Sequence, residues 1–251
     1  MQVFITDEEI INKLKISSRD KVLDVGGSMR QHPLIEIDTL VDVIRPEDAP
    51  YGPSKLKAKN FVKVDITKNK LPFKDKYFDI CLCTHVLEDL SDPFFVIEEM
   101  ARVAKKGLIV TPSMGEDMNF SKFDFTDWLT GARRAPGQAH HKWFFLNDGK
   151  SLEILPKIYP VLYTKDFQVT GWSGENEMKY FWQGKIDYDE FSGLDVHKLI
   201  DRYEVFMNKS SKYIKKGTAV IFIDNPFNIL RAFAKLFFKK GEGYKHRKKT
   251  E

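Results

Sequence analysis

Residues 21–28 read Lys-Val-Leu-Asp-Val-Gly-Gly-Ser, and the rest of the chain is organised around them. Val22, Leu23 and Val25 form an apolar run with β-branched members, which is typical of a strand buried on both faces of a sheet. Two glycines follow, and glycine lets the backbone turn sharply and lets a ligand approach without meeting a Cβ. Nucleotide-like ligands bind where such a strand ends early in an α/β chain. The same glycine pair is also common in ordinary tight turns.

Further apolar runs predict a series of buried strands. They are residues 39–44, 61–66, 78–83 and 108–110, followed by 167–172, 177–182 and 218–223. The predicted helices are a short one with the apolar stripe Ile10, Ile11 and Leu14, a segment from Asp92 to residues 105–107, and residues 195–207. Thr6 and Glu9 have the spacing of a capping box before the first of these helices. Strands that alternate with helices predict a mostly parallel sheet covered on both faces.

The composition is that of a globular protein. The chain has 251 residues, 42% hydrophobic and 30% charged, enough for one domain with an insertion or a tail. Its net charge of +4 is uneven, because residues 226–251 carry eight Lys and Arg against two acids, whereas the remainder is slightly acidic. The body therefore lacks the basic face that nucleic-acid-binding proteins present. No signal peptide and no run of transmembrane length is visible, which predicts a cytoplasmic protein.

Cys81 and Cys83 are the only two cysteines of the chain. Two positions apart on a strand, their side chains point the same way and are too close in sequence for an ordinary disulfide. We interpret them as buried thiols in a reducing compartment.

Three segments together resemble a known family. Residues 22–27 (VLDVGG) resemble an acid-x-Gly-x-Gly motif. Residues 64–79 contain VDI, LPF and FD at the spacing of a second motif, and residues 84–90 (THVLEDL) resemble a segment written S-x-HVLEHL. Over roughly residues 18–114 the chain is similar to class I S-adenosylmethionine-dependent methyltransferases of the type-11-like group. The resemblance implies a Rossmann-like α/β fold with a mostly parallel seven-stranded sheet and helices on both faces.

The same resemblance implies which residues hold S-adenosylmethionine. They are Asp24, Gly26, Gly27, Ser28, Asp42, Asp65, Ile66 and Thr84. Asp24 and the glycines would surround the methionine part, Asp42 would accept from the ribose hydroxyls, and Asp65 from the adenine amino group. Asp42 has an alternative role as the cap of a turn, because a proline-containing loop follows it.

The chain also departs from the family pattern. Gly-Gly-Ser stands where Gly-x-Gly is expected, and Pro33 shortens or removes the helix that normally follows. A relic pocket in a non-catalytic Rossmann-like module is therefore one alternative. A nicotinamide enzyme is disfavoured, because Gly-x-Gly-x-x-Gly is absent.

Residues 115–145 are rich in aromatic and polar side chains and are interpreted as an insertion that covers the substrate. His140 and His141 near its end, together with His85, are the candidates for a catalytic base, which is needed if the acceptor is a poorly acidic hydroxyl. The two adjacent histidines are alternatively structural, and a metal would need further ligands that the sequence does not place. No metal is predicted. A helix is expected to start at Ser151.

The acceptor is interpreted as a small molecule or a glycan- or lipid-linked intermediate. The alternative is a nucleic-acid methyltransferase tethered by its basic tail. We divide the chain into a methyltransferase domain, residues 1–225, and a C-terminal segment, residues 226–251. Within that segment residues 227–240 have the pattern of a basic amphipathic helix, so residues 227–249 either contact an anionic membrane or dock on the domain or a second subunit.

Overall fold

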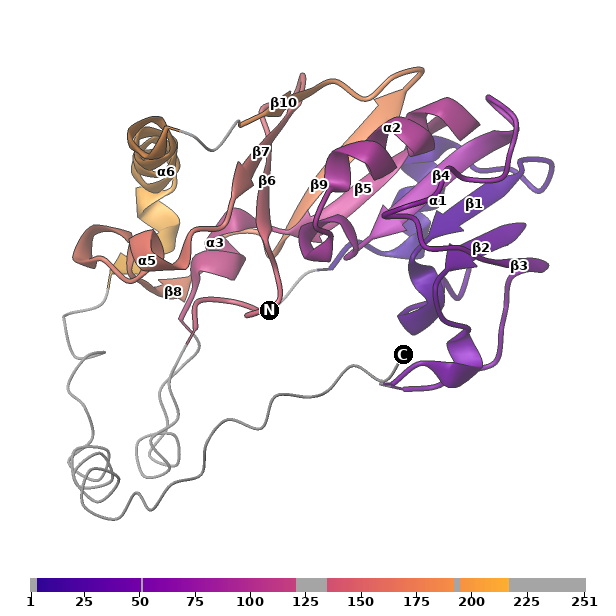
Figure 1. The fold of residues 1–251 in the computed structure, drawn as a ribbon, viewed down its shortest axis with the longest axis horizontal. Helices are drawn as coiled ribbons and strands as arrows, with labels where there is room; N and C mark the ends of the chain where they lie inside the picture. Colours follow the sequence, from indigo (N-terminus) through magenta and orange to yellow (C-terminus); the bar gives the residue numbers. More distant parts are fainter. Residues whose placement is uncertain (1–3, 51, 121–134, 192–194, 217–251) are drawn as a thin grey trace, which may run out of the picture.

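The structure is a computed structural model that describes residues 4–50, 52–120, 135–191 and 195–216 (Figure 1). Its central sheet has the strand order β3-β2-β1-β4-β5-β9. The strands are β1 Val22–Val25, β2 Thr39–Asp42, β3 Asn60–Lys63, β4 Phe78–Thr84, β5 Ala104–Pro112 and β9 Glu177–Gln183. All are parallel except β9, which runs antiparallel to β5. The predicted mostly parallel sheet is therefore confirmed.

The described part of the sheet has six strands, not the expected seven. Residues 169–172 do form a strand, β8 (Val169–Trp172), but it pairs with β11 (Ile214–Lys216) in a separate two-stranded sheet. The expected strand at 218–223 lies outside the described residues. The antiparallel strand β9 therefore follows directly after β5 in the sheet.

Strand β1 lies in the middle of the parallel part, between β2 and β4. Its alternating side chains divide the core into two. Leu23 and Val25 face one core, together with Cys81 and Cys83, while Val22 faces the other. Both cysteines are free and fully buried, as expected for thiols on one side of a strand.

Helices cover the two faces of the sheet. Helix α2 (Pro93–Val103) packs on the first core, and α1 (Asp7–Leu14) covers the second. The N-cap of α1 is Thr6, whose Oγ1 accepts from the backbone N–H of Glu9, and Asp92 caps α2. Helix α2 ends at Val103 and not at the expected residues 105–107, because β5 already begins at Ala104 and pairs with β4.

The connection between β1 and β2 contains no α-helix. It has only a 3-10 turn, η1 (Gly27–Met29), followed by the extended residues around Pro33. The loss of the helix predicted from Pro33 is thus confirmed. The side chains of Ile35 and Ile37 take its place on the second core.

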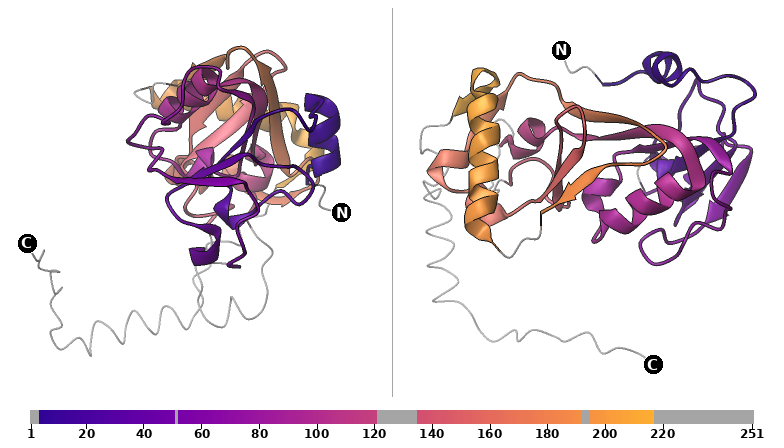
Figure 2. Two further views of the ribbon diagram at one scale, coloured as in Figure 1. Left: turned by 90° about the vertical axis from the view of Figure 1, so that its right-hand side faces the viewer. Right: turned by 90° about the horizontal axis from the view of Figure 1, so that it is seen from above.

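The second half of the chain builds a separate layer with its own core. Strands β6 (Trp143–Asn147), β7 (Leu152–Pro156) and β10 (Tyr188–Glu190) form a three-stranded sheet. Around it lie α3 (Met114–Met118), α5 (Tyr159–Leu162) and α6 (Val196–Lys209). Figure 2 shows α6 at one end of the molecule and the central sheet at the other.

The residues after Ser151 therefore form a strand and not the expected helix. Leu152 and Ile154 alternate into the core under α2, whereas Leu155 faces the other way into the core around α6. Because alternate side chains of a strand point to opposite faces, a strand lets this short segment bury its apolar side chains in both cores. The predicted helix at 195–207 is confirmed by α6, on which Leu199, Tyr203 and Met207 are buried.

Remaining short turns are η2 (Pro46–Asp48), η3 (Leu87–Asp89), η4 (Lys165–Phe167) and η5 (Ser211–Tyr213). No helix among the described residues is long and apolar enough to cross a membrane. The amphipathic segment at 226–251 and the middle of the expected insertion, residues 121–134, lie outside the described residues.

Arg102 of α2 holds the LPF turn to the sheet. Its guanidinium donates to the backbone oxygens of Leu71 and Phe73 at 2.9 and 2.8 Å. It also pairs with Glu99, which in turn accepts from the Leu71 N–H at 2.7 Å. Five donors in a planar fork suit this set of acceptors, which explains an arginine at this place.

We expect Arg102→Ala to lower the free energy of unfolding by about 2–3 kcal/mol, because Glu99 is left buried without its cation. Lys185→Ala is the control, since Lys185 is largely exposed and pairs with the half-exposed Asp187 at the surface. It should change stability by less than about 0.5 kcal/mol. Urea unfolding of both variants measures the difference, and equal effects would contradict the role given to Arg102.

Candidate functional site

The turn after β1 depends on both of its glycines. Gly26 has a φ of +78°, in the left-handed region, and a Cβ there would collide with the side chain of Val86. A Cβ on Gly27 would overlap the carboxylate of Asp24. The turn therefore leaves room for the Asp24 side chain beneath it.

Asp24 is a buried acid with an unused acceptor. Its side chain is almost fully buried, and its Oδ1 has no hydrogen-bond partner. Burial raises the pKa of the Asp24 carboxyl to about 6; nearby His32 lowers it, and the charges of Asp42 and Asp7 raise it further. A buried acceptor without a donor is costly, so a ligand that donates to Asp24 would be favoured.

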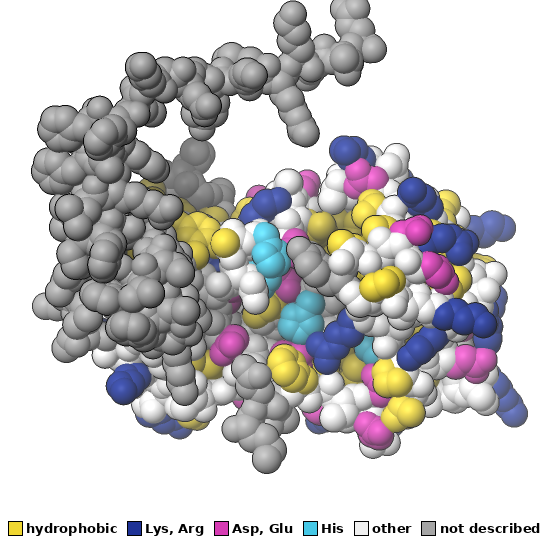
Figure 3. All heavy atoms as spheres, turned by 90° about the horizontal axis from the view of Figure 1, so that it is seen from below, with side chains coloured by type: hydrophobic (Ala, Val, Ile, Leu, Met, Phe, Trp, Pro, Cys, Tyr) yellow, Lys and Arg dark blue, Asp and Glu magenta, His cyan; other side chains and the backbone are white. Residues whose placement is uncertain are grey.

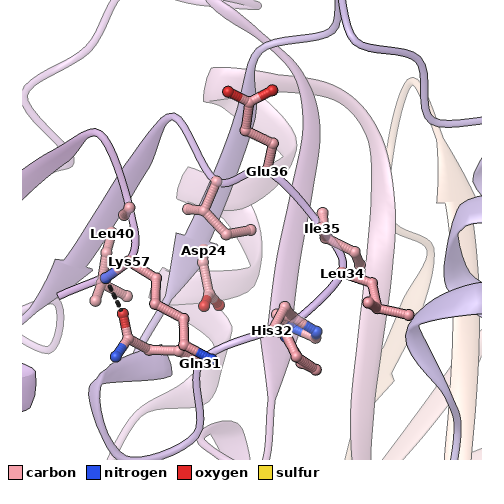
Figure 4. Close-up of a pocket in the computed structure, with 11 residues that line it drawn as sticks. Asp24, Gln31, His32, Leu34, Ile35, Glu36, Leu40 and Lys57 are labelled. Atoms are coloured by element: carbon pink, nitrogen blue, oxygen red, sulfur yellow. Dashed lines mark hydrogen bonds between the residues drawn. The ribbon is translucent and has the colours of Figure 1, made fainter. Parts of the chain in front are cut away.

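A cavity of about 290 Å³ adjoins Asp24 (Figure 4). It is lined by residues 31–37 together with Asp24, Leu40, Lys57 and Ala58. One of its walls is His32, whose Nδ1 lies 2.7 Å from Oδ1 of the buried Asp7. The other ring nitrogen of His32 is buried and has no partner. The cavity thus presents both an unpaired acid and an unpaired imidazole nitrogen.

Asp42 at the end of β2 is tied to the turn after β1. Its Oδ2 accepts from the Ser28 N–H at 3.1 Å, and its Oδ1 accepts from the N–H groups of Val43 and Ile44. Ser28 also donates through Oγ to the backbone oxygen of Ile44 at 2.6 Å. The carboxylate caps its own turn, yet Oδ2, which accepts one hydrogen bond from the chain, can accept another. The capping role and the ribose role are therefore compatible.

Asp65 and Ile66 follow β3, away from this turn. Asp65 accepts from Thr67 and pairs with Lys68 at 2.8 Å. The hydrogen bond from Lys68 has the largest effect on the pKa of the Asp65 carboxyl, and together with those from Thr67 it lowers this pKa to about 2. Ile66 is buried in the core. Thr84, at the end of β4, has a buried Oγ1 with no partner, like Asp24 on the neighbouring strand.

His85 is clamped between two buried carboxylates. Its Nε2 lies 2.8 Å from Oε1 of Glu177, and its Nδ1 lies 3.5 Å from Oε1 of Glu88. Burial lowers the pKa of His85, but the hydrogen bonds and charges of Glu177 and Glu88 outweigh it and raise the pKa to about 9. The ring is therefore protonated at neutral pH, and an imidazolium has no lone pair with which to act as a base.

His140 and His141 lie on the other side of η3. His141 is buried and His140 is exposed, and both Nε2 atoms face Oδ1 of Asp89, at 3.8 and 3.6 Å. Nδ1 of His141 lies 2.9 Å from Oδ1 of the buried Asp117. A second cavity, of about 550 Å³, opens here. The three candidate histidines thus flank one short turn, of which Glu88 faces His85 and Asp89 faces the other two.

The sequence reasoning missed several residues that the structure brings into these sites. The sequence could have indicated Glu88 and Asp89 as site residues, because they belong to the THVLEDL segment and lie close to His85 in the chain. His32, Asp117 and Glu177 had none. Glu177 lies 92 residues from its partner His85, and only the pairing of β5 with β9 brings it to the carboxyl edge.

The pKa of His85 has a consequence for stability. Because it rises from 6.5 to about 9 on folding, the folded protein binds more protons than the unfolded chain between these values. The stabilisation, about 2–3 kcal/mol, is fully present below pH 6.5 and is lost as the pH rises through 9. Urea unfolding from pH 6 to 10 should show this loss in the native protein and not in His85→Gln. Parallel profiles for the two proteins would contradict the clamp.

Comparison with known proteins supports the family resemblance. Residues 38–111 match the family model described as "Methyltransferase domain". The matched stretch runs from β2 to β5 and contains Asp42, Asp65 and Thr84, whereas the turn after β1 precedes it. The resemblance inferred from the motifs is confirmed by this match. No curated protein matches the sequence.

Solved structures match about half of the chain or less. Among them are a SAM-dependent methyltransferase from Aquifex aeolicus (25% identity, 42% of this chain and 63% of that chain, TM-score 0.32) and one from Methanosarcina mazei (20%, 45% and 59%, 0.33). A third is an arsenic(III) S-adenosylmethionine methyltransferase from Chlamydomonas reinhardtii (19%, 38% and 39%, 0.29). This chain spans about half the length of the first matched structures. The order β3-β2-β1-β4-β5 of the parallel strands is itself that of a Rossmann-like α/β sheet.

Proposed function

We propose that the protein is an S-adenosylmethionine-dependent methyltransferase that acts on a small-molecule, glycan or lipid-linked acceptor. The observation that carries the proposal is Asp24, a buried carboxylate with an unpaired oxygen at the end of the strand that the family motif marks. The family match of residues 38–111 supports the same conclusion from a different part of the chain.

The residues present fit this cofactor. S-adenosylmethionine has a primary ammonium group, which is positively charged, and the unpaired Oδ1 of Asp24 is a negatively charged acceptor for it. The glycine turn allows close approach of the methionine part, and Thr84 offers a hydroxyl without a partner. Asp42 keeps acceptor capacity for ribose hydroxyls, and Asp65 would accept from the adenine amino group.

The cofactor supplies a methyl group on a positively charged sulfur, which is already activated toward nucleophiles. The contribution of the chain is then largely to position the acceptor. His85, held as an imidazolium between Glu88 and Glu177, is assigned to fixing the carboxyl edge of the sheet and not to taking a proton. His140 and His141 lie on the side assigned to the acceptor.

The acceptor is placed in the larger cavity beside η3. Every residue that lines it except Ala139 carries a polar or charged group; the others are Asp89, His140, His141, Lys142, Lys157 and Tyr159. This lining suits a polar acceptor that carries hydroxyl or acidic groups. Residues 135–145 supply part of the lining, which supports the role of segment 115–145 as the cover of the acceptor. Attachment to a membrane or to nucleic acid depends on residues 226–251, outside the described part of the chain.

Titration calorimetry with S-adenosylmethionine tests the proposal. We expect one site per chain, with an affinity at least tenfold weaker in Asp24→Asn, because the variant loses the anionic partner of the ammonium group. Asp201→Asn, an exposed position on α6, is the matched control and should bind like the native protein. No binding by the native protein at millimolar cofactor would refute the proposed function.

The same variant should be more stable than the native protein. The pKa of Asp24 rises from 3.8 to about 6 on folding, so the native protein loses stability as the pH rises through this range. At pH 7.5 the free energy of unfolding of Asp24→Asn should therefore be about 2–3 kcal/mol higher than that of the native protein. This difference should shrink as the pH falls below 6. A variant less stable at pH 7.5 would show that the carboxylate is needed for folding and not for a ligand.

A further inference from the structure

Two histidines and an acid meet at the mouth of the larger cavity. Asp89 ends η3, and His140 and His141 precede β6, some fifty residues later in the chain. One ligand atom from each of the three lies within 4.8 Å of the other two. Figure 3 shows histidine side chains near the middle of one face of the molecule, with acidic side chains beside them. Asp89 is thus a third candidate ligand beside the two histidines, and the sequence did not place it there.

The spacing of these atoms is close to that of ligands around one ion. A tetrahedral ion with bonds of about 2.0–2.1 Å holds neighbouring ligand atoms about 3.3 Å apart. Nε2 of His140 and Nε2 of His141 lie 3.6 and 3.8 Å from Oδ1 of Asp89. Side-chain movements of a few tenths of an ångström close the difference at Asp89. The ligand nitrogens of the two histidines lie within 4.8 Å of each other, and the exposed ring of His140 can turn to bring them closer.

Asp89 has an oxygen available for such an ion. Its Oδ1 is buried and has no hydrogen-bond partner. The nearby Lys142 does not neutralise it, since its Nζ donates to the backbone oxygen of Asp89 and to Oγ of Ser91. The backbone N–H of Lys142 also donates to the oxygen of Glu88 at 2.7 Å, which fixes the two ligand segments to each other.

Asp117 orients the buried histidine. Its Oδ1 lies 2.9 Å from Nδ1 of His141, which leaves Nε2 of that ring facing Asp89. Asp117 is itself held by the backbone N–H of Gln138 and by Nζ of the buried Lys157, 3.0 Å away. A carboxylate behind a ligating imidazole is the usual support of a metal-bound histidine.

We propose that Asp89, His140 and His141 bind a divalent first-row transition-metal ion, with Zn²⁺ as the preferred probe. Two imidazoles and one carboxylate are ligands that such ions accept, whereas hard ions such as Mg²⁺ prefer oxygen ligands and disfavour the two imidazoles. Three protein ligands leave a coordination position open toward the cavity. If the proposed methyl transfer holds, an acceptor oxygen would take that position and lose its proton more readily there. The metal site itself does not depend on that function.

Calorimetric titration of the chelator-treated full-length protein with Zn²⁺ tests the proposal. We expect one ion per chain with a micromolar or tighter affinity. The affinity should fall at least tenfold in His140→Ala and in Asp89→Ala. The His140 side chain is 64% exposed, so its removal leaves the fold intact. His197→Ala, an exposed histidine on α6, is the control and should stay within twofold of the native protein.

Asp117→Asn tests the positioning role separately. We expect a 10- to 100-fold loss of Zn²⁺ affinity. The bound Co²⁺ should also show a changed visible spectrum, which a purely structural role would not produce. Circular dichroism shows whether this variant has folded.

Absence of Zn²⁺ binding, or an affinity unchanged in both His140→Ala and Asp89→Ala, would refute the metal site. Zn²⁺ binding without binding of S-adenosylmethionine would refute the proposed function alone and leave the metal site standing.

Discussion

The ion pair between His85 and Glu177 holds together the edge of the sheet at which both candidate sites lie. It joins the end of β4 to the start of β9, and Glu177 also accepts from the backbone N–H of Ile5. His85 adopts a φ of +55°, which costs a non-glycine residue roughly 1 kcal/mol or more. Glu88 completes the clamp from η3. The segments around Ile5, His85 and Glu177, which are distant in sequence, are thus held together at one point. The buried charges of this cluster are stable in the interior only as a group.

Asp24 shows the opposite treatment of a buried charge. Glu177 has both carboxylate oxygens paired, one with the His85 ring and one with the Ile5 N–H, whereas Asp24 in the same sheet keeps an oxygen without a donor. Burial of such a group lowers stability, and proteins tolerate this cost mainly where a ligand provides the missing partner. The contrast between the paired Glu177 and the unpaired Asp24 separates a residue that shapes the site from a residue that is available to bind.

The short turn η3 connects the two sites. Glu88 faces His85 on the side proposed for the cofactor, and its neighbour Asp89 faces His140 and His141 on the side proposed for the acceptor. The backbone of the same turn accepts from Lys142, and the indole of Trp143 donates to the oxygen of Leu90 just after it. A shift of this turn would therefore move both sites together. The layer built from β6, β7 and β10 contacts the two candidate sites through this turn.

The sequence by itself determined the local features of this protein. Alternating or continuous apolar runs predicted strands β1 to β5 and β9, Thr6 and Asp92 predicted helix starts, and Pro33 predicted the missing helix, because each depends on residues a few positions apart. The sequence did not determine that residues 152–156 form a strand, since a short apolar run suits a buried strand or a helix until its neighbours are known. It also did not reveal that Glu177 faces His85, or that Asp89 lies beside His140 and His141. Those contacts join residues 51 to 92 positions apart, and only the tertiary fold brings their side chains within 4 Å of each other.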